Sequence, residues 1–345
     1  MILGETDLNK NKTFIIAELS ANHNGVLQNA LDTIKAAKEA GADAIKLQTY
    51  TADTMTIDCN KEDFIVKGGT LWDGKSLYEL YQWASTPWKW HKELFDYARE
   101  IGIDIFSTPF DKTAVDFLEQ FNPIIYKIAS FEITDYELVR YIASKGKPVI
   151  ISTGIATIQE IQDVVDICRS EGNDNIVLLH CVSAYPALLE DANLKMIPNL
   201  AETFGVISGF SDHTMGISAA IAAVALGAKV IEKHFILDKS IGGPDAGFSS
   251  DKAEFTEMVK AVRDTEKMLG AVNYAMTDKK RKSRRFARSL YVVKDVKKEE
   301  KLTADNVRSI RPGYGLHPKY YNDIMGRKAK QDIERGTPLN WEYLQ

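Results

Sequence analysis

Short apolar runs rich in β-branched residues alternate with longer stretches of helical pattern over roughly the first 270 residues. In one such stretch Leu27, Ala30, Leu31 and Ile34 recur at the spacing of one helix face. The apolar runs are short and are bounded by polar or turn residues, as strands are. We predict eight strands, at residues 14–20, 44–48, 103–107, 124–128, 149–153, 176–180, 206–210 and 229–235.

Eight strands that are each followed by a helix predict an α/β fold of the (β/α)8 TIM-barrel type, which commonly takes about 250 residues. The competing architecture is an open doubly wound sheet that binds dinucleotides. It would place a Gly-x-Gly-x-x-Gly motif after the first strand, and this chain has none there. We therefore predict a barrel over residues 1–270, with its chemistry at the carboxyl ends of the strands.

The pattern is interrupted once within the barrel, between the second and third strands. This interruption includes residues 70–90, which contain Trp72, Trp83, Trp88 and Trp90. Such a segment could form a lid over the barrel mouth, a dimer contact or an extra helix on the outside. The sequence leaves these possibilities open.

The chain changes character after the barrel. Residues 279–285 are almost all Lys or Arg, and in an acidic protein we interpret them as part of a solvated linker, 271–285, rather than a nucleic-acid patch. Residues 286–345 form a small β-rich module in which 293–302 resembles 330–339. A module this small is close to the lower limit of independent stability, so we expect it to dock on another surface.

Composition excludes several classes of protein. The chain is 45% hydrophobic and 26% charged, which is ordinary for a globular protein. A net charge of −5 and a pI near 5.8 argue against a nucleic-acid partner. No apolar run approaches the roughly 20 residues of a membrane span, and the first residues lack the pattern of a signal peptide. Three scattered cysteines indicate reduced thiols in a cytoplasmic enzyme.

The last two predicted strands carry a candidate metal site. Alternate residues of a strand share one face, so Glu232 lies with His234 and Ser211 with His213. If the strands are neighbours, two imidazoles, a carboxylate and a hydroxyl converge, which suits a divalent metal with open coordination positions. The alternative is a pair of core histidines bonded to backbone groups.

Polar residues also end the other predicted strands. Lys46 and Lys127, with hydroxyl groups from several strands, would suit a phosphate and a carboxylate together. A buried lysine without an anionic ligand is costly, so an anionic substrate is favoured. The alternative is that each lysine caps a helix or pairs with a nearby Glu.

Seven of these segments, in order, resemble the sialic acid synthase family: residues 16–25, 46–48, 107–110, 126–130, 152–154, 211–213 and 232–235. The tail, with Arg311-Pro312-Gly313, is similar to the C-terminal antifreeze-like (β-clip) domain of that family. The family condenses phosphoenolpyruvate with an aminosugar aldehyde. The resemblance therefore implies these two small-molecule substrates and a domain-swapped homodimer.

The resemblance also implies roles for individual residues. Phosphoenolpyruvate would be held by Lys46, Thr108, Lys127, Ser130, Ser152 and Ser211. His213 and His234 would bind Mn²⁺, Mg²⁺ or Co²⁺ and so take part in catalysis. Glu232 is our candidate to activate water, with Glu18 as the alternative acid or base. The sugar would be faced by Glu18, Gln48, Tyr185 and Asp245, together with Arg311 from the partner subunit.

Finer motifs indicate the pseudaminic acid branch of that family. They are Glu18–His23, Phe131-Glu132, Gly315–Pro318 and Ser183, where sialic acid synthases tend to carry Asn. This branch uses 2,4-diacetamido-2,4,6-trideoxy-altrose as the acceptor. The alternatives are an N-acetylneuraminate or legionaminate synthase, a metal-dependent pyruvate aldolase, or a non-catalytic carbohydrate- or ice-binding protein.

Overall fold

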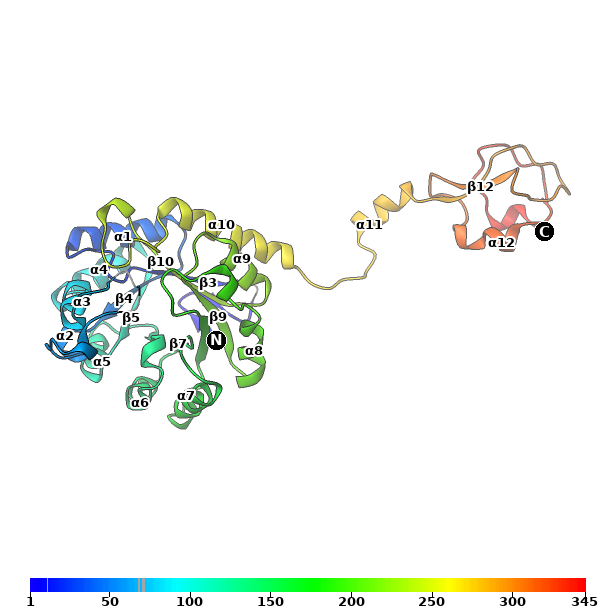
Figure 1. Cartoon of the computed structure of the whole chain (residues 1–345). Helices are drawn as coiled ribbons and strands as arrows, with labels where there is room; N and C mark the ends of the chain where they lie inside the picture. The colour runs from blue at the N-terminus through cyan, green and yellow to red at the C-terminus, as the bar shows by residue number, and fades with distance from the viewer. Residues whose placement is uncertain (11, 68, 70–71) are drawn as a thin grey trace. The chain divides into compact units, whose positions relative to one another are not determined.

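The computed structural model describes residues 1–10, 12–67, 69 and 72–345. The chain forms two compact units, Met1–Gly270 and Ala271–Gln345 (Figure 1). In the described part of the chain, no helix is long and apolar enough to cross a membrane.

The first unit is a closed barrel of eight parallel strands, which confirms the predicted fold. The predicted strands are all present, with ends within two residues of those expected. They are β3 (Phe14–Glu18), β4 (Ala44–Thr49), β5 (Asp104–Pro109), β6 (Tyr126–Ile128), β7 (Val149–Ser152), β8 (Ile176–Cys181), β9 (Ile207–Asp212) and β10 (Val230–His234). Each strand pairs with the next in sequence, and β10 closes the barrel against β3.

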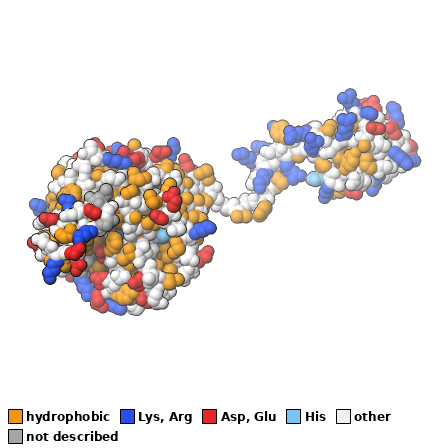
Figure 2. Space-filling model, viewed as in Figure 1, with side chains coloured by type: hydrophobic (Ala, Val, Ile, Leu, Met, Phe, Trp, Pro, Cys, Tyr) orange, Lys and Arg blue, Asp and Glu red, His pale blue; other side chains and the backbone are white. Residues whose placement is uncertain are grey.

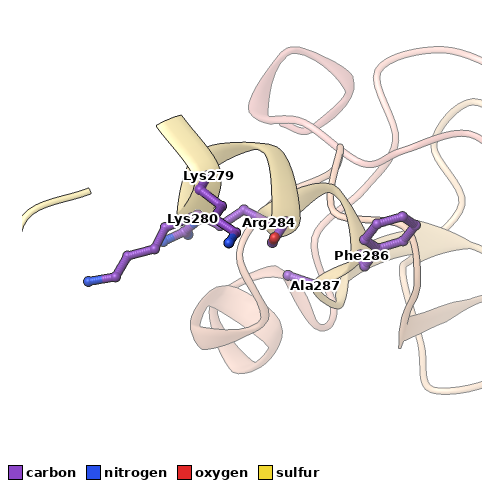
Figure 3. Close-up of a pocket in the computed structure, with 6 residues that line it drawn as sticks. Lys279, Lys280, Arg284, Phe286 and Ala287 are labelled. Atoms are coloured by element: carbon purple, nitrogen blue, oxygen red, sulfur yellow. The ribbon is translucent and has the colours of Figure 1, made fainter. Parts of the chain in front are cut away.

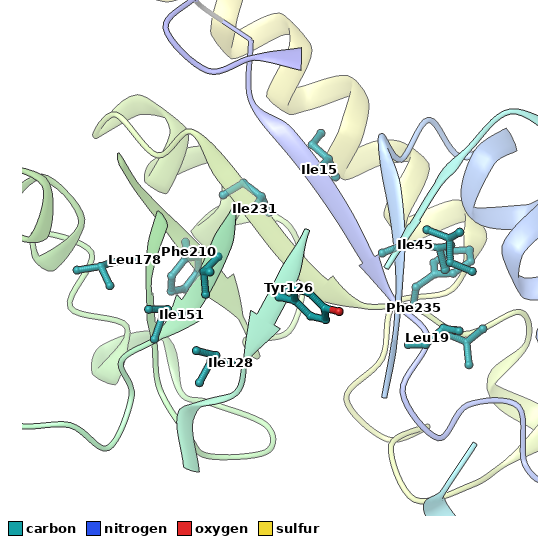
Figure 4. Close-up of a cluster of buried hydrophobic side chains, with 14 of the residues drawn as sticks. Ile15, Leu19, Ile45, Tyr126, Ile128, Ile151, Leu178, Phe210, Ile231 and Phe235 are labelled. Atoms are coloured by element: carbon teal, nitrogen blue, oxygen red, sulfur yellow. The ribbon is translucent and has the colours of Figure 1, made fainter. Parts of the chain in front are cut away.

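Helices surround the strands, as Figure 1 shows. They are α1 (Leu27–Glu39), α4 (His91–Ile101), α5 (Lys112–Glu119), α6 (Tyr136–Ala143), α7 (Ile158–Ser170), α8 (Met196–Phe204), α9 (Ser218–Ala225) and α10 (Lys252–Leu269). Asp111, Thr157 and Asp251 start their helices by accepting backbone N–H groups of the first turn. The outward faces of the strands and the inner faces of the helices form one apolar layer, in which Ile15, Ile45 and Ile231 are buried (Figure 4).

A second apolar cluster fills the lower part of the barrel interior. Phe14, Ile16 and Phe106 point inward near the strand starts. Leu3 and Leu8 join them from the N-terminal hairpin β1 (Ile2–Leu3) and β2 (Thr6–Asp7), so this hairpin closes the bottom of the barrel. The upper interior, at the carboxyl ends of the strands, is lined by polar residues instead.

The segment between β4 and α4 folds as α2 (Ala52–Met55), η1 (Glu62–Phe64), α3 (Leu77–Ala84) and η2 (Trp88–Trp90). The Trp72 indole N–H donates to Pro244 O at 3.1 Å, in the loop after β10, so this part reaches the barrel mouth. Trp88 stacks on Phe117 of α5, with ring centroids 4.4 Å apart, on the outside. The segment therefore packs on the outside of the barrel and also contacts the loop after β10; whether it is a lid stays a prediction. Thr70, the first residue of the predicted segment, lies outside the described residues.

The second unit contains α11 (Asp278–Ser283), η6 (Arg284–Phe286), β11 (Ser289–Val292), β12 (Val307–Ile310), η7 (Pro318–Tyr320), α12 (Tyr321–Ile324) and η8 (Trp341–Tyr343). Its two weakly similar segments meet antiparallel at the bridge between Val296 and Ile333. The basic stretch that we interpreted as linker is helical over Asp278–Ser283. Lys and Arg side chains gather on it (Figure 2). An open hollow there is lined by Lys279, Lys280, Ser283, Arg284, Phe286 and Ala287 (Figure 3).

Candidate active site

The candidate site lies inside the barrel at the carboxyl ends of the strands. The parallel register pairs Glu18 with Lys46 and with His234, and Glu232 with Ser211. All of these residues are buried. Strand alternation therefore brings together side chains that lie more than 200 residues apart in sequence.

Lys46 is the centre of a buried ionic cluster. Its Nζ lies 3.1 Å from Glu18 Oε2 and 3.2 Å from Glu232 Oε1, and it donates to Thr108 Oγ1 at 3.4 Å. Glu232 also accepts from Ser211 Oγ at 3.1 Å. Two carboxylates thus share one ammonium group. For Lys46, the structure therefore shows the alternative named above, in which the lysine pairs with a nearby Glu.

The two carboxylates titrate differently. Burial raises the pKa of Glu18 to about 7, although Lys46 opposes the shift. Burial would also raise the pKa of Glu232, but Lys46 and Lys127 outweigh it and lower that pKa below its ordinary value. Near neutral pH, Glu232 is therefore ionised while Glu18 is partly protonated, a division suited to acid and base roles.

Lys127 has quite different surroundings. It is fully buried and donates to Ser152 Oγ at 2.7 Å and to Ile128 O at 2.9 Å. No carboxylate within the described residues forms an ion pair with it. Burial lowers the pKa of Lys127 to about 8, and the attraction of Glu232 opposes this only partly. A buried cation with neutral partners is a position that an anionic ligand would stabilise.

Small side chains pack closely at the ends of β6, β7 and β8. Ser183 Oγ donates to Ser130 Oγ at 3.0 Å, and Ser130 Oγ accepts from the backbone N–H of Ile155 at 3.1 Å. A Cβ atom at Gly154 would come within 2.5 Å of Ser183 Oγ and 2.7 Å of Cys181 Sγ. Gly154 is therefore required for this arrangement of hydroxyl groups.

The two histidines lie side by side near the ends of β9 and β10. Their ring centroids are 5.5 Å apart. His213 Nδ1 bonds to Val182 O at 2.8 Å, while the buried His234 Nδ1 has no hydrogen-bond partner. Burial lowers the pKa of both residues, so the rings are neutral at physiological pH. Neutral imidazoles with an available ring nitrogen are suitable metal ligands.

These residues fit a divalent metal that has few protein ligands. No group of three His, Cys, Asp or Glu residues in the described part of the chain could hold a metal ion. Glu232 forms its ion pair with Lys46 and accepts from Ser211, while its charge also acts on His213. The protein thus offers two nitrogens, and other positions would be left for water or substrate, as at catalytic rather than structural sites.

A chain of polar contacts connects β3 and β4 to the loop after β10. Gln48 Nε2 donates to Glu18 Oε1 at 3.0 Å and to Ser20 Oγ at 2.9 Å. Ser20 Oγ in turn donates to Asp245 Oδ2 at 2.5 Å, and this oxygen is 3.9 Å from His234 Nδ1. The residues expected to face the sugar on this side therefore form one hydrogen-bonded network that ends close to His234, without a hydrogen bond to it.

Aromatic rings flank the histidine pair on another side. Tyr185 lies 4.4 Å from the His213 ring and 5.1 Å from Phe248, and Phe248 lies 4.9 Å from His234, between ring centroids. The Trp72 ring is 6.1 Å from Tyr185. The site thus has an apolar wall beside its imidazoles. Arg311 belongs to the second unit, where it is exposed.

Sequence reasoning did not select several residues that line this region: Ser20, Trp72, Glu132, Gly154, Cys181 and Phe248. Burial raises the pKa of Glu132 to about 7, with Lys127 acting against the shift, so the Glu132 carboxylate lies within the electrostatic reach of Lys127. Glu132 and Gly154 belong to motifs on which the family resemblance rests, and this membership was a signal that could have identified them. Phe248 comes from a loop without such a signal, whereas Trp72 lies in the segment for which a lid was one of the alternatives.

Comparison with known proteins identifies relatives over the whole chain. The sequence is 54% identical over 339 residues to the pseudaminic acid synthase of Campylobacter jejuni, covering 98% of each chain. It is 50% identical to the pseudaminic acid synthase of Helicobacter pylori, covering 96% of this chain and 97% of that one. The crystal structure of the N-acetylneuraminic acid synthetase of Leptospira borgpetersenii in complex with citrate matches with a TM-score of 0.73 at 32% identity, over 82% of this chain and 94% of that one.

The family comparison agrees with the motifs. The model of the SAF domain matches residues 287–345, and the model of the NeuB family matches residues 33–274. The resemblance predicted from the strand-end motifs is therefore confirmed. The chain belongs to the NeuB family.

Proposed function

We propose that this chain condenses phosphoenolpyruvate with 2,4-diacetamido-2,4,6-trideoxy-altrose and water, giving pseudaminic acid and phosphate. The observation that carries the proposal is the 54% identity, over 98% of both chains, to an enzyme named pseudaminic acid synthase. The buried polar site at the barrel mouth supports this proposal, because it brings cationic, acidic and imidazole groups together at one end of the barrel.

Lys127 and the surrounding hydroxyl groups suit the anionic donor. An anion next to Lys127 would supply the partner that this buried ammonium group lacks. In this proposal Lys46 and Lys127 provide charge for phosphoenolpyruvate, and hydroxyl groups provide directed hydrogen bonds. The hydroxyl donors would be Thr108, Ser130, Ser152 and Ser211.

In the proposed reaction, C3 of phosphoenolpyruvate forms a bond to the aldehyde carbon of the acceptor. A divalent ion held by His213 and His234, Mn²⁺, Mg²⁺ or Co²⁺, would supply Lewis acidity at the aldehyde oxygen. Water adds to C2, and the resulting centre expels phosphate by cleavage of the C–O bond. Glu232, kept ionised by two lysines, would orient or deprotonate this water. Glu18, whose pKa is raised, would serve as a proton donor.

The aromatic wall supports a deoxy acceptor. A methyl group at C6 loses nothing on contact with Tyr185, Phe248 and Trp72, whereas a hydroxyl group there would lose its hydrogen bonds to water. Such a wall would favour the trideoxy sugar over N-acetylmannosamine. Asp245 and Gln48, on the polar side, would bind the remaining polar groups of the sugar.

We further propose a domain-swapped homodimer in which Arg311 of the partner subunit completes the sugar site. Large exposed apolar side chains in the segments after β6 to β9, including the first residue of α7, offer a docking surface at the barrel mouth: Phe131, Ile155, Ile158, Leu188, Leu189 and Met215. In the segment that follows α10, the side chains of Val272 and Tyr274 are also exposed, with relative exposures of 90% and 94%. Both features favour association with a second copy.

Product analysis by mass spectrometry tests the proposed function. The purified protein is given phosphoenolpyruvate with the diacetamido-trideoxy sugar and N-acetylmannosamine in competition, and phosphate release is measured in parallel. We expect pseudaminic acid as the main keto-acid product, with one phosphate per product. Equal or better use of N-acetylmannosamine, or of a legionaminic acid precursor, would contradict the acceptor. Turnover of pyruvate without phosphate release would favour an aldolase.

A further inference from the structure

A fully buried ion pair lies next to the histidines but outside the barrel interior. Lys233 Nζ is 2.8 Å from Asp212 Oδ2, and the two side chains are 1% and 0% exposed. The residues are register partners across β9 and β10. Their neighbours Ser211 and Glu232 hydrogen-bond to each other inside the barrel, so Asp212 and Lys233 point outward, between the strands and the helices.

The ion pair extends into a clamp around His213. Lys233 Nζ also donates to Thr214 O at 2.7 Å. The other carboxylate oxygen, Asp212 Oδ1, accepts from the backbone N–H of Thr214 at 2.9 Å and from its hydroxyl at 2.7 Å. The residues on both sides of His213 are therefore tied to Lys233, which directly precedes His234. One set of bonds holds the backbone that carries both imidazoles.

Stability alone gives little reason for this arrangement. Removing two charges from water offsets most of their mutual attraction, and apolar side chains of similar size usually stabilise a buried position as well or better. Apolar side chains could not reproduce the directed bonds to Thr214. The clamp therefore fixes the local backbone geometry at the carboxyl ends of β9 and β10, where His213 and His234 lie.

We infer that Asp212 and Lys233 are positioning residues for the metal site, which hold the imidazoles of His213 and His234 at the separation at which both can bind one divalent ion. The inference rests on the metal site of the proposed function. Residues that support metal ligands from outside commonly contribute about 10–100-fold to metal affinity. We expect an effect of this size although neither residue can touch the metal.

The test is a titration of Mn²⁺ into the metal-free protein, with free Mn²⁺ measured by electron paramagnetic resonance. Lys233→Met breaks the clamp but leaves Asp212 as an unpaired buried charge, which can impair folding. The double variant Asp212→Asn/Lys233→Met leaves no such charge, and the Asn side chain keeps an oxygen that can accept from Thr214. Arg263→Met is the control, because it removes an ion pair with Asp43, 2.6 Å long, beside the start of β4 at the opposite end of the barrel.

We expect the double variant to melt close to the wild type and to bind Mn²⁺ about 10–100-fold more weakly. The Arg263→Met control should lose thermal stability and keep wild-type Mn²⁺ affinity. If the double variant binds Mn²⁺ within twofold of the wild-type affinity, this inference is overturned and the proposed metal site is not affected. Unchanged Mn²⁺ binding in His213→Ala would overturn the proposed metal site as well.

Discussion

At the scale of single residues, two lysines buried at the same end of the barrel illustrate how surroundings determine role. Lys46 forms ion pairs with Glu18 and Glu232, and these raise its pKa despite burial. Lys127 has only neutral hydrogen-bond partners, and burial lowers its pKa to about 8. The same substitution should therefore cost little stability at Lys127 and much more at Lys46.

We predict that Lys127→Met raises the KM for phosphoenolpyruvate at least tenfold and changes the melting temperature little, because it removes a buried charge that has no ionic partner. Lys46→Met is the matched comparison. It leaves two buried carboxylates without their cation and should cost about 3–5 kcal/mol of unfolding free energy. Steady-state kinetics and thermal melting measure both effects. A large loss of stability in Lys127→Met with an unchanged KM would show that Lys127 is structural.

The pH dependence of donor binding follows from the same residue. Lys127 carries its charge below a pKa of about 8 and loses it above, so kcat/KM for phosphoenolpyruvate should fall as the pH rises through 8. Lys127→Arg keeps the charge at all these pH values, so any activity it retains should lack the fall near pH 8 and keep only the earlier fall from Glu18, whose pKa is about 7. The measurement is kcat/KM between about pH 6.5 and 9.5. A profile that is identical in both proteins would assign the fall to another group.

At the scale of elements, the segment between β4 and α4 connects the outside of the barrel to its mouth. The elements that flank it are joined by a hydrogen bond, 2.8 Å long, between Thr49 Oγ1 of β4 and His91 Nε2 of α4. On the outside of the barrel, Trp88 packs on Phe117. At the mouth, Trp72 bonds to the loop that carries Asp245 and lies near Tyr185. Under the proposed function, the segment would therefore lie on the acceptor side of the site and not on the donor side.

We predict that Trp72→Ala raises the KM for the sugar acceptor several-fold and leaves the KM for phosphoenolpyruvate within about twofold, because it opens the apolar wall. Trp83→Ala in the same segment is the control, since Trp83 is 41% exposed and contacts Lys75 on the surface. Both KM values are measured for each variant. Equal effects of the two substitutions, or a change in the donor KM only, would contradict a covering role at the acceptor.

At the scale of the whole molecule, the chain separates into a barrel that holds most candidate site residues and a small unit that holds Arg311. The small unit has its own apolar core, which includes Leu290, Val292 and Leu302. It also exposes Tyr314 close to Arg311 in sequence, at 68%. An exposed aromatic and a guanidinium group on one small unit are suited to recognition of a second surface.

We predict that mixing Arg311→Ala and His234→Ala, each inactive alone, restores activity after dissociation and reassembly. In a swapped dimer, half of the reassembled dimers would be mixed, and each would contain one intact site. The expected activity is therefore at most about a quarter of the wild type. Each variant that is dissociated and reassembled alone is the control. If one chain builds the whole site, every site in the mixture stays defective and no activity returns.

The sequence by itself determined the strands, their order and the face on which the polar residues lie. Two-residue alternation is a local property, so Glu232 and His234 had to share a face, and the β-branched runs identified the eight strands of the barrel. The strand-end motifs also identified the family. These conclusions follow from the spacing of residues within single segments of the chain.

Only the tertiary structure decided which groups interact. It assigned Glu232 to Lys46 and Ser211 rather than to the histidines, left Lys127 without a carboxylate, and brought Trp72 and Phe248 to the site from distant loops. The physical reason is that Coulomb and hydrogen-bond energies in a buried site depend on separations of a few ångströms and on the removal of water. Strand periodicity specifies the face of a residue but not these distances.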